Sequence, residues 1–195
     1  MGEITQLAAD EEKLARTGQA GAGPSVATAT DRRLDAENWL LSAALDRARA
    51  RTDWAEQGVA LLRCDGPFNA VKICADLVHA AAGTDVPSKV DAYLAQALHG
   101  GPVFYDLIGC EYYVLVPPSP GRREWSVYRQ GEAEFLGRDC CMGVPRVTAL
   151  LPEGVRQYWR VPLHGTGELA SVDAVTQLID AGRFRRARAE GLAGG

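Results

Sequence analysis

The sequence predicts an α+β fold, in which a mainly antiparallel sheet is covered by helices in a single domain with flexible tails. Segments with apolar residues at helical spacing are followed by blocks of short, strand-like segments. Short turns join several of these strand-like segments, as antiparallel pairing requires. The chain has 195 residues, the length of one domain, and 47% of them are hydrophobic, which is enough for a sizeable core.

The helical part of the pattern begins with a long amphipathic segment. Apolar residues recur at helical spacing over Leu34–Trp54, and we expect this helix to break near Thr52–Asp53 and to end at Gly58. Shorter helices are predicted over Ala75–Ala82, Ser88–Leu98 and Ser171–Ala181. Ser88 and Asp91 have the spacing of a capping box, which marks the start of a helix.

The strands are predicted from short apolar or alternating segments. They are Val59–Arg63, Phe68–Ile73, Val103–Tyr105, Tyr112–Val116, Glu134–Leu136, Cys140–Met142, Val147–Leu151 and Tyr158–Val161. The turn signal Asp65–Pro67 predicts that the first two strands form a hairpin, and the turn around Gly109 predicts a second hairpin from the next two.

The predicted domain covers residues 34–183 and is flanked by two tails. The N-terminal tail, residues 1–33, contains the run Thr17–Ser25, which holds no aromatic residue and cannot bury enough surface to offset its ordering entropy. The C-terminal tail, residues 184–195, is basic and rich in glycine. No segment is apolar over the ~18 residues that a bilayer requires, and the N-terminus lacks the pattern of a secretory signal. We therefore expect a cytoplasmic protein with no membrane partner.

The net charge and the cysteine content limit which partners and cofactors are expected. The formal net charge is −4, which favours a protein partner or self-association over nucleic acid, although a local basic patch could still bind a phosphate backbone. An odd number of cysteines without an export signal argues against a disulfide framework. The five are Cys64, Cys74, Cys110, Cys140 and Cys141. None has the spacing of a zinc ligand pair, so we predict no metal and no cofactor.

A series of short segments, in this order along the chain, resembles a group of small actinobacterial proteins similar to the N-terminal domain of bifunctional DNA primase/polymerases. The matching features are Trp54, Leu61–Val71, Gly101–Val103, Tyr113–Pro118, Leu136–Gly137 and Tyr158–Pro162. The resemblance extends from Gly58 to Pro162, after the leading helix with Trp54, and covers about half of the chain. The resemblance implies a related fold and an ancestral link to nucleotidyl transfer.

The chain departs from that family at the residues that carry catalysis. Active members use a D-x-D pair on a strand to hold divalent metals, because Mg²⁺ and Mn²⁺ prefer carboxylate oxygens. The corresponding strand here has the neutral Asn69 and the cationic Lys72, and Asp65 stands alone before the turn. The resemblance therefore implies a non-catalytic relative, with no catalytic residue to assign.

One segment combines cations with aromatic residues, as in proteins that bind single-stranded nucleic acid or nucleotides. It contains Arg122, Arg123, Trp125, Tyr128 and Arg129. Arginine would contact phosphate, and tryptophan or tyrosine would stack on a base. The alternative is a solvated strand or loop whose Trp125 points inward.

Two other constellations remain open. Cys64, beside a turn, and His164, in a glycine-flanked loop, could form a thiol–imidazole pair if the fold brings them together. Asp106 and Glu111 bracket a hairpin turn, where paired acids could perform acid–base chemistry, but a hairpin tip is usually wet.

We therefore predict a non-catalytic binding or regulatory domain of primase/polymerase-like ancestry. The first alternative is an enzyme with an unrecognised site, for divalent-metal nucleotidyl transfer or a thiol-dependent reaction. The second is a small-ligand-sensing domain with an apolar pocket lined by Tyr105, Tyr112 and Trp159.

Overall fold

The computed structural model describes residues 28–64, 66–118 and 131–193, which form helices and two antiparallel sheets. The helices are α2 (Ala29–Leu41), α3 (Arg47–Gln57), α4 (Ala75–Ala82), α5 (Pro87–Ala97) and α6 (Val172–Ala193). The strands are β1 (Val59–Arg63), β2 (Asn69–Cys74), β3 (Val103–Asp106), β4 (Glu111–Val116), β5 (Ala133–Leu136), β6 (Cys141–Pro145) and β7 (Gln157–Val161). The α+β fold predicted from the sequence is confirmed.

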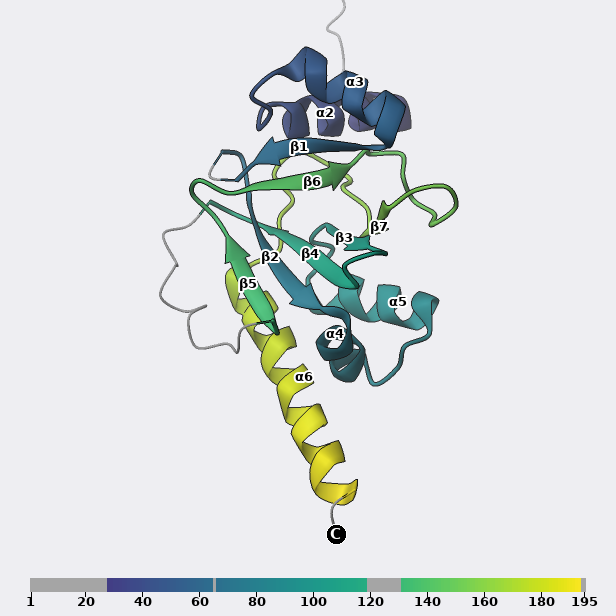
Figure 1. Cartoon of the computed structure of the whole chain (residues 1–195), viewed down its shortest axis with the longest axis vertical. Coiled ribbons are helices and arrows are strands. Elements are labelled where there is room, and N and C mark those ends of the chain that lie inside the picture. Colours follow the sequence, from purple (N-terminus) through teal and green to yellow (C-terminus); the bar gives the residue numbers. More distant parts are fainter. Residues whose placement is uncertain (1–27, 65, 119–130, 194–195) are drawn as a thin grey trace, which may run out of the picture.

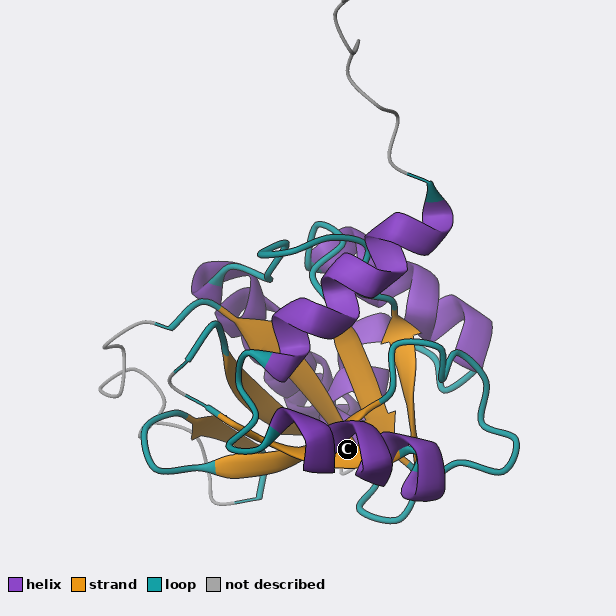
Figure 2. Ribbon diagram, turned by 90° about the horizontal axis from the view of Figure 1, so that it is seen from above, coloured by secondary structure: helices purple, strands orange, loops and turns teal. Residues whose placement is uncertain are grey.

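A five-stranded sheet, in the order β5-β2-β4-β3-β7, forms the middle layer of the molecule. Helices α4, α5 and α6 cover one of its faces, and the two-stranded sheet of β1 and β6, backed by α2 and α3, lies on the other side (Figure 1). Seen from above, the strands lie between helices on both sides (Figure 2).

Alternation along the central strands divides the core into two apolar clusters. Val71 and Ile73 of β2 face α4, α5 and α6, whereas Ala70 faces the β1–β6 side. Neighbouring residues of a strand point to opposite faces, so the one sheet contributes to both clusters. Lys72 lies two residues after Ala70 on β2, so its side chain is on the same face of the sheet, toward β1 and β6.

The N-terminal helical segment is two helices and not one. Asp46 caps α3 by accepting hydrogen bonds from the backbone N–H groups of Ala48 and Arg49, so the break lies at residues 42–46. The expected break at Thr52–Asp53 is wrong, because the Thr52 hydroxyl donates to the Ala48 carbonyl inside the helix. Gly58 ends α3 as predicted, with a left-handed φ of 74°.

The predicted hairpin of the first two strands is also wrong. β1 pairs with β6, and β2 pairs with β4 and β5. The predicted hairpin around Gly109 is confirmed, with Val103 opposite Val114 and Asp106 opposite Glu111 in β3 and β4.

Three further expectations differ from the structure. Helix α5 begins at Pro87 after an N-cap at Val86, so Ser88 is not the cap, and Asp91 accepts a hydrogen bond from Arg160 instead. Val147–Leu151 is turn and coil, not strand. Helix α2 begins at Ala29 and α6 continues to Ala193, so residues 29–33 and 184–193 are helical rather than parts of flexible tails.

Candidate functional site

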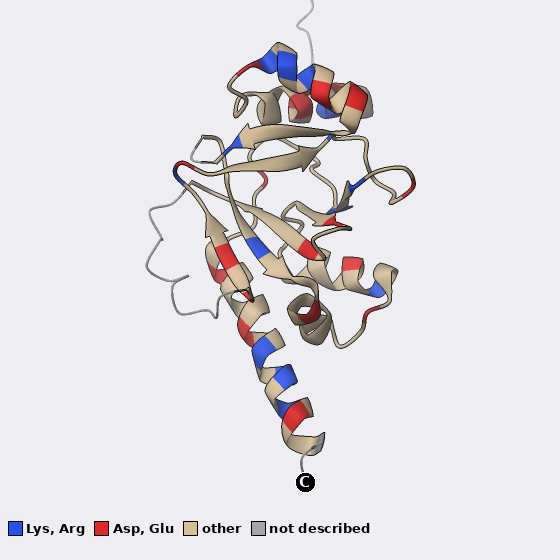
Figure 3. Cartoon of the chain, viewed as in Figure 1, with Lys and Arg blue, Asp and Glu red and all other residues tan. Residues whose placement is uncertain are grey.

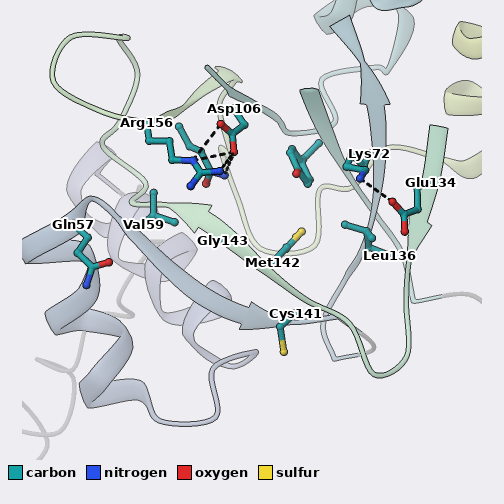
Figure 4. Close-up of a pocket in the computed structure, with 12 residues that line it drawn as sticks. Gln57, Val59, Lys72, Asp106, Glu134, Leu136, Cys141, Met142, Gly143 and Arg156 are labelled. Atoms are coloured by element: carbon teal, nitrogen blue, oxygen red, sulfur yellow. Dashed lines mark hydrogen bonds and ion pairs between the residues drawn. The ribbon is translucent and has the colours of Figure 1, made fainter. Parts of the chain in front are cut away.

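A cleft of about 510 Å³ opens between the two sheets, on the face of the five-stranded sheet opposite α4, α5 and α6. Both sheets line this inter-sheet cleft, together with the end of α3 (Figure 4). Its lining residues are Gln57, Val59, Lys72, Asp106, Tyr113, Glu134, Leu136, Cys141, Met142, Gly143, Arg156 and Gln157. Most of the polar lining residues come from the five-stranded sheet. The apolar lining residues are Val59 of β1, Leu136 of β5 and Met142 of β6.

Asp106, at the end of β3, is the centre of a buried polar network in the cleft. The residue is only 2% exposed. Its Oδ1 accepts from the backbone N–H groups of Ile108 and Gly109, and its Oδ2 accepts from Nη2 of Arg156 and Nε2 of Gln157, both at 2.9 Å. Nε of Arg156 contacts both carboxylate oxygens (Figure 4). A buried carboxylate needs such donors because burial removes its water.

These hydrogen bonds determine the charge of Asp106. Burial alone would raise the pKa of its carboxyl group, but the hydrogen bonds from Arg156, from Gln157 and from the two backbone groups outweigh burial and lower the pKa to about 2. Asp106 is therefore ionised at neutral pH and can only accept hydrogen bonds.

The charge of Asp106 fixes the orientation of the neighbouring amide. Gln157 is 5% exposed, and its Nε2 faces the acceptor-only Asp106. Its Oε1 must then point the other way, where it is buried and has no hydrogen-bond partner among the described residues. Most buried polar atoms in proteins are paired, so this oxygen is an exception.

A second polar cluster occupies the other end of the cleft. Nζ of Lys72 lies 2.8 Å from Oε2 of Glu134 on β5 and 3.4 Å from Oε1 of Glu111 on β4. In Figure 3 a basic segment of β2 lies between acidic segments of β4 and β5. The hydrogen bond to Glu134 raises the pKa of Lys72 against the opposing effect of burial, so the ammonium stays charged.

Tyr113 forms part of the floor between these two clusters. Its ring stacks on Phe104 at a centroid distance of 4.8 Å, and its hydroxyl donates to Oε2 of Glu111. Burial, and secondarily the negative charge of Glu111, raise the pKa of Tyr113. The phenol is therefore neutral at physiological pH.

The structure tests only some of the candidate residues that the sequence indicated. Arg122, Arg123, Trp125, Tyr128 and Arg129 lie outside the described residues. The expectation of a wet hairpin tip is wrong for Asp106, which is buried. Asp106 and Glu111 do not act as an acid pair, because each engages its own cation.

The expected apolar pocket of Tyr105, Tyr112 and Trp159 is contradicted. Tyr112 packs in the cluster beneath α4 and α5, whereas Trp159 packs in the cluster on the opposite face of the sheet. Tyr105 and Tyr112 surround the guanidinium of Arg160 together with Tyr158.

The thiol–imidazole pair finds no support in the placement of its two members. Cys64 is a buried thiol at the end of β1, and His164 is exposed in the loop after β7. None of the five cysteines, all of which lie in the described residues, forms a disulfide.

Sequence reasoning missed Arg156, Gln157 and Glu134 as functional candidates. Gln157 lies 51 positions from Asp106 along the chain, and a single glutamine carries no local pattern. Among the charged residues of the cleft, Asp106 at a hairpin turn and Lys72 on a strand did carry a local signal in the sequence.

Within the residues that the structure describes, no three His, Cys, Asp or Glu side chains gather as a metal site. None of the described helices is long and apolar enough to cross a membrane. The chain matches no protein-family model, no curated protein and no solved structure, so the inter-sheet cleft itself is the source of any functional argument.

Proposed function

We propose that the chain is a non-catalytic binding domain of primase/polymerase-like ancestry, and that the inter-sheet cleft holds a small polar ligand. The observation that carries this proposal is the network at an open cleft in which the exposed Arg156 and the buried Gln157 both donate to the buried Asp106. Burying charge gives little or no net stability compared with well-packed apolar residues. A network of this kind beside open volume is typical of a ligand site, where a few fixed polar groups orient the ligand.

The state of the carboxylates supports binding rather than catalysis. A carboxylate with a pKa of about 2, such as Asp106, is a weak general base at neutral pH. Glu111 and Glu134 are bridged by the ammonium of Lys72. In active members of the family that the sequence resembles, acids of this kind bind divalent metal ions. Here a lysine side chain supplies the positive charge.

The test is a ligand screen on the full chain by thermal shift, followed by calorimetry, with a library of uncharged, zwitterionic and anionic metabolites. The cleft variant is Arg156→Ala, and the matched control is Arg146→Ala, because Arg146 is also exposed and lies outside the cleft. We expect at least one small polar molecule to raise the melting temperature of the wild type and of Arg146→Ala, and to bind Arg156→Ala about tenfold more weakly or worse.

Two results would overturn the proposal. Consumption of a nucleoside triphosphate in the presence of Mn²⁺, abolished by Asp106→Asn, would establish the alternative of a nucleotidyl-transfer enzyme. A library in which no molecule distinguishes Arg156→Ala from Arg146→Ala would remove the cleft as the binding site.

A further inference from the structure

We propose that Cys64 and Cys140 form a redox-sensitive dithiol site, which hydrogen peroxide closes to a disulfide and a small thiol reopens. The two cysteines lie 76 positions apart along the chain and meet because β1 pairs with β6. The site does not depend on ligand binding in the inter-sheet cleft.

The pairing of β1 with β6 places the two cysteines opposite each other. Arg63 is the register partner of Cys141, so one step further along this antiparallel pair Cys64 faces Cys140. The backbone N–H of Cys64 donates to the carbonyl of Cys140 at 2.9 Å, as this alignment requires. Residues opposite each other at such a hydrogen-bonded position have Cα atoms about 5.5 Å apart, which is within the range that disulfides span.

The side chains of Cys64 and Cys140 lie on the same face of the strand pair. Both pack in the apolar cluster that contains Leu62 and Phe68. Cβ atoms of facing residues are about 4.5–5.5 Å apart, whereas a disulfide needs about 3.8 Å, so closure requires a movement of about 1 Å. Cys140 lies just before β6, at the end of a turn in which its N–H donates to the carbonyl of Gly137, so the strand ladder does not hold it on both sides. A bond closed with some strain is readily reduced, which makes the site reversible.

The difference in exposure sets the order of the reactions. Cys64 is 2% exposed and Cys140 is partly exposed, so a small oxidant meets Cys140 first. The Cys140 thiolate attacks one oxygen of hydrogen peroxide and breaks the O–O bond, which gives a sulfenic acid and releases the other oxygen as water. Sγ of Cys64 then attacks the sulfur of Cys140, forms the S–S bond and displaces the hydroxyl group as a second water. In total the pair of thiols loses two hydrogen atoms, and one peroxide is reduced to two waters.

The neighbouring Cys141 offers a matched comparison. Adjacent residues of a strand point to opposite faces, and Cys141 is exposed and lines the inter-sheet cleft. The residue opposite it on β1 is Arg63, which carries no thiol. Cys141 is therefore as close to the site in sequence as a residue can be, but it lacks a partner across the strands.

The experiment treats the folded full chain with hydrogen peroxide, blocks the remaining thiols with N-ethylmaleimide and maps disulfides by mass spectrometry of unreduced peptides. A background variant, Cys110→Ser with Cys141→Ser, removes the two exposed cysteines and keeps the pair. Cys140→Ser and Cys64→Ala, each added to this background, remove one member of the pair. Dimedone, which traps sulfenic acids, is included in a parallel reaction of each protein.

We expect a disulfide between Cys64 and Cys140 in the wild type and in the background variant, about tenfold or more above any other cysteine pair, since only these thiols are held face to face. Dithiothreitol should remove it, and the linked protein should keep the circular dichroism spectrum of the reduced protein. Cys140→Ser should form no link within the chain, and Cys64→Ala should accumulate the dimedone adduct on Cys140.

Three results would overturn the inference. The first is a disulfide that joins a different pair of cysteines, and the second is a link that appears only with loss of the native circular dichroism spectrum. The third is the absence of any link at a peroxide concentration that oxidises Cys110 and Cys141. Because no ligand enters the assay, each of these results leaves the proposed function of the inter-sheet cleft in place.

Discussion

Asp106 keeps its charge inside the protein because N–H donors replace the water that burial removes. Two of these donors belong to its own hairpin backbone, and the others come from Arg156 and Gln157. The carboxylate thereby links the turn between β3 and β4 to the start of β7. Single residues of this kind shape the cleft and also tie neighbouring elements together.

The low pKa of Asp106 makes the stability of the protein depend on pH. A group whose pKa is lowered on folding stabilises the protein above its unfolded pKa, and this contribution is lost as the pH falls through the folded pKa. With a pKa of about 2 against the ordinary aspartate value of 3.8, the contribution is about 2 kcal/mol and disappears between about pH 4 and pH 2. Urea unfolding of the wild type and of Asp106→Asn should show a stability difference that shrinks over this interval. A difference that does not vary with pH would contradict this account of Asp106.

Lys72 is predicted to separate two carboxylates that would otherwise repel each other. Lys72→Met should lower the free energy of unfolding by about 1 kcal/mol, because the pair with Glu134 is partly exposed. The pKa of Lys72 is raised on folding, so its contribution is complete below the ordinary lysine value of 10.5 and is lost as the pH rises through the folded value.

The measurement for Lys72 is chemical unfolding at neutral pH, at low and at high salt. High salt should reduce the difference between Lys72→Met and the wild type, since it screens the remaining charges. The matched control is Lys89→Met, because Lys89 is exposed on α5 and should change stability by less than about 0.5 kcal/mol. An equal loss in both variants would show that the clustered carboxylates play no part.

At the scale of elements, the position of α6 depends on one glycine. Helix α6 packs on α4, and a Cβ at Gly182 would lie 2.4 Å from the backbone oxygen of Leu77. Glycine within a helix normally costs about 1 kcal/mol relative to alanine. The close approach of the two helices explains why glycine stands here in spite of that cost.

Gly182→Ala should therefore destabilise the protein although alanine favours a helix. The added methyl group must push α6 away from α4, which costs about 1–3 kcal/mol. Gly191→Ala is the control, because a Cβ there meets nothing within 4 Å and should stabilise the helix by up to about 1 kcal/mol. Thermal unfolding followed by circular dichroism measures both, and a shift of the same sign in the two variants would argue against the steric explanation.

Local signals predicted several elements but not their partners. Helix α3 ends before Gly58 and helix α4 ends at Ala82, as expected, because Gly58 and Gly83 adopt the left-handed conformation without strain. The turn at Gly109 likewise joins β3 and β4. In contrast, the apolar pattern of β1 does not say which strand lies beside it, and its partner β6 lies far along the chain.

The cleft was still less accessible to prediction from the sequence. Asp106 and Gln157 meet only because β3 and β7 are neighbours in the sheet, and Lys72 and Glu134 meet because β2 and β5 are neighbours. The sequence did show Lys72 as a cation on the strand where active members of the resembled family carry metal-binding acids. Its pairing with Glu111 and Glu134 required the strand order.

At the scale of the whole molecule, one sheet joins two apolar clusters. Strands β2 and β4 contribute Val71 and Val114 to one cluster, and Ala70 and Leu115 to the other. Neither cluster can lose its packing without disturbing the strands on which the other depends. The molecule should therefore unfold as one cooperative unit.

Leu94→Ala tests this coupling. Leu94 is fully buried on α5, and its truncation should cost about 2–5 kcal/mol. Trp39, Trp54 and Trp159 belong to the other cluster. The unfolding midpoints measured by tryptophan fluorescence and by helical circular dichroism should nevertheless fall together. Leu192→Ala, at a site 80% exposed, should leave both midpoints unchanged, and separate midpoints in Leu94→Ala would reveal two independent units.

The close pairing of opposite charges across the cleft also bears on how a ligand would reach it. Arg156 lies 2.9 Å from Asp106 and Lys72 lies 2.8 Å from Glu134, so the fields of these ions largely cancel a few ångströms into the solvent. Long-range attraction accelerates encounters only where one sign of charge prevails. Molecules would therefore arrive by unguided diffusion, at rates that barely respond to ionic strength, and discrimination would begin only once they touch the walls.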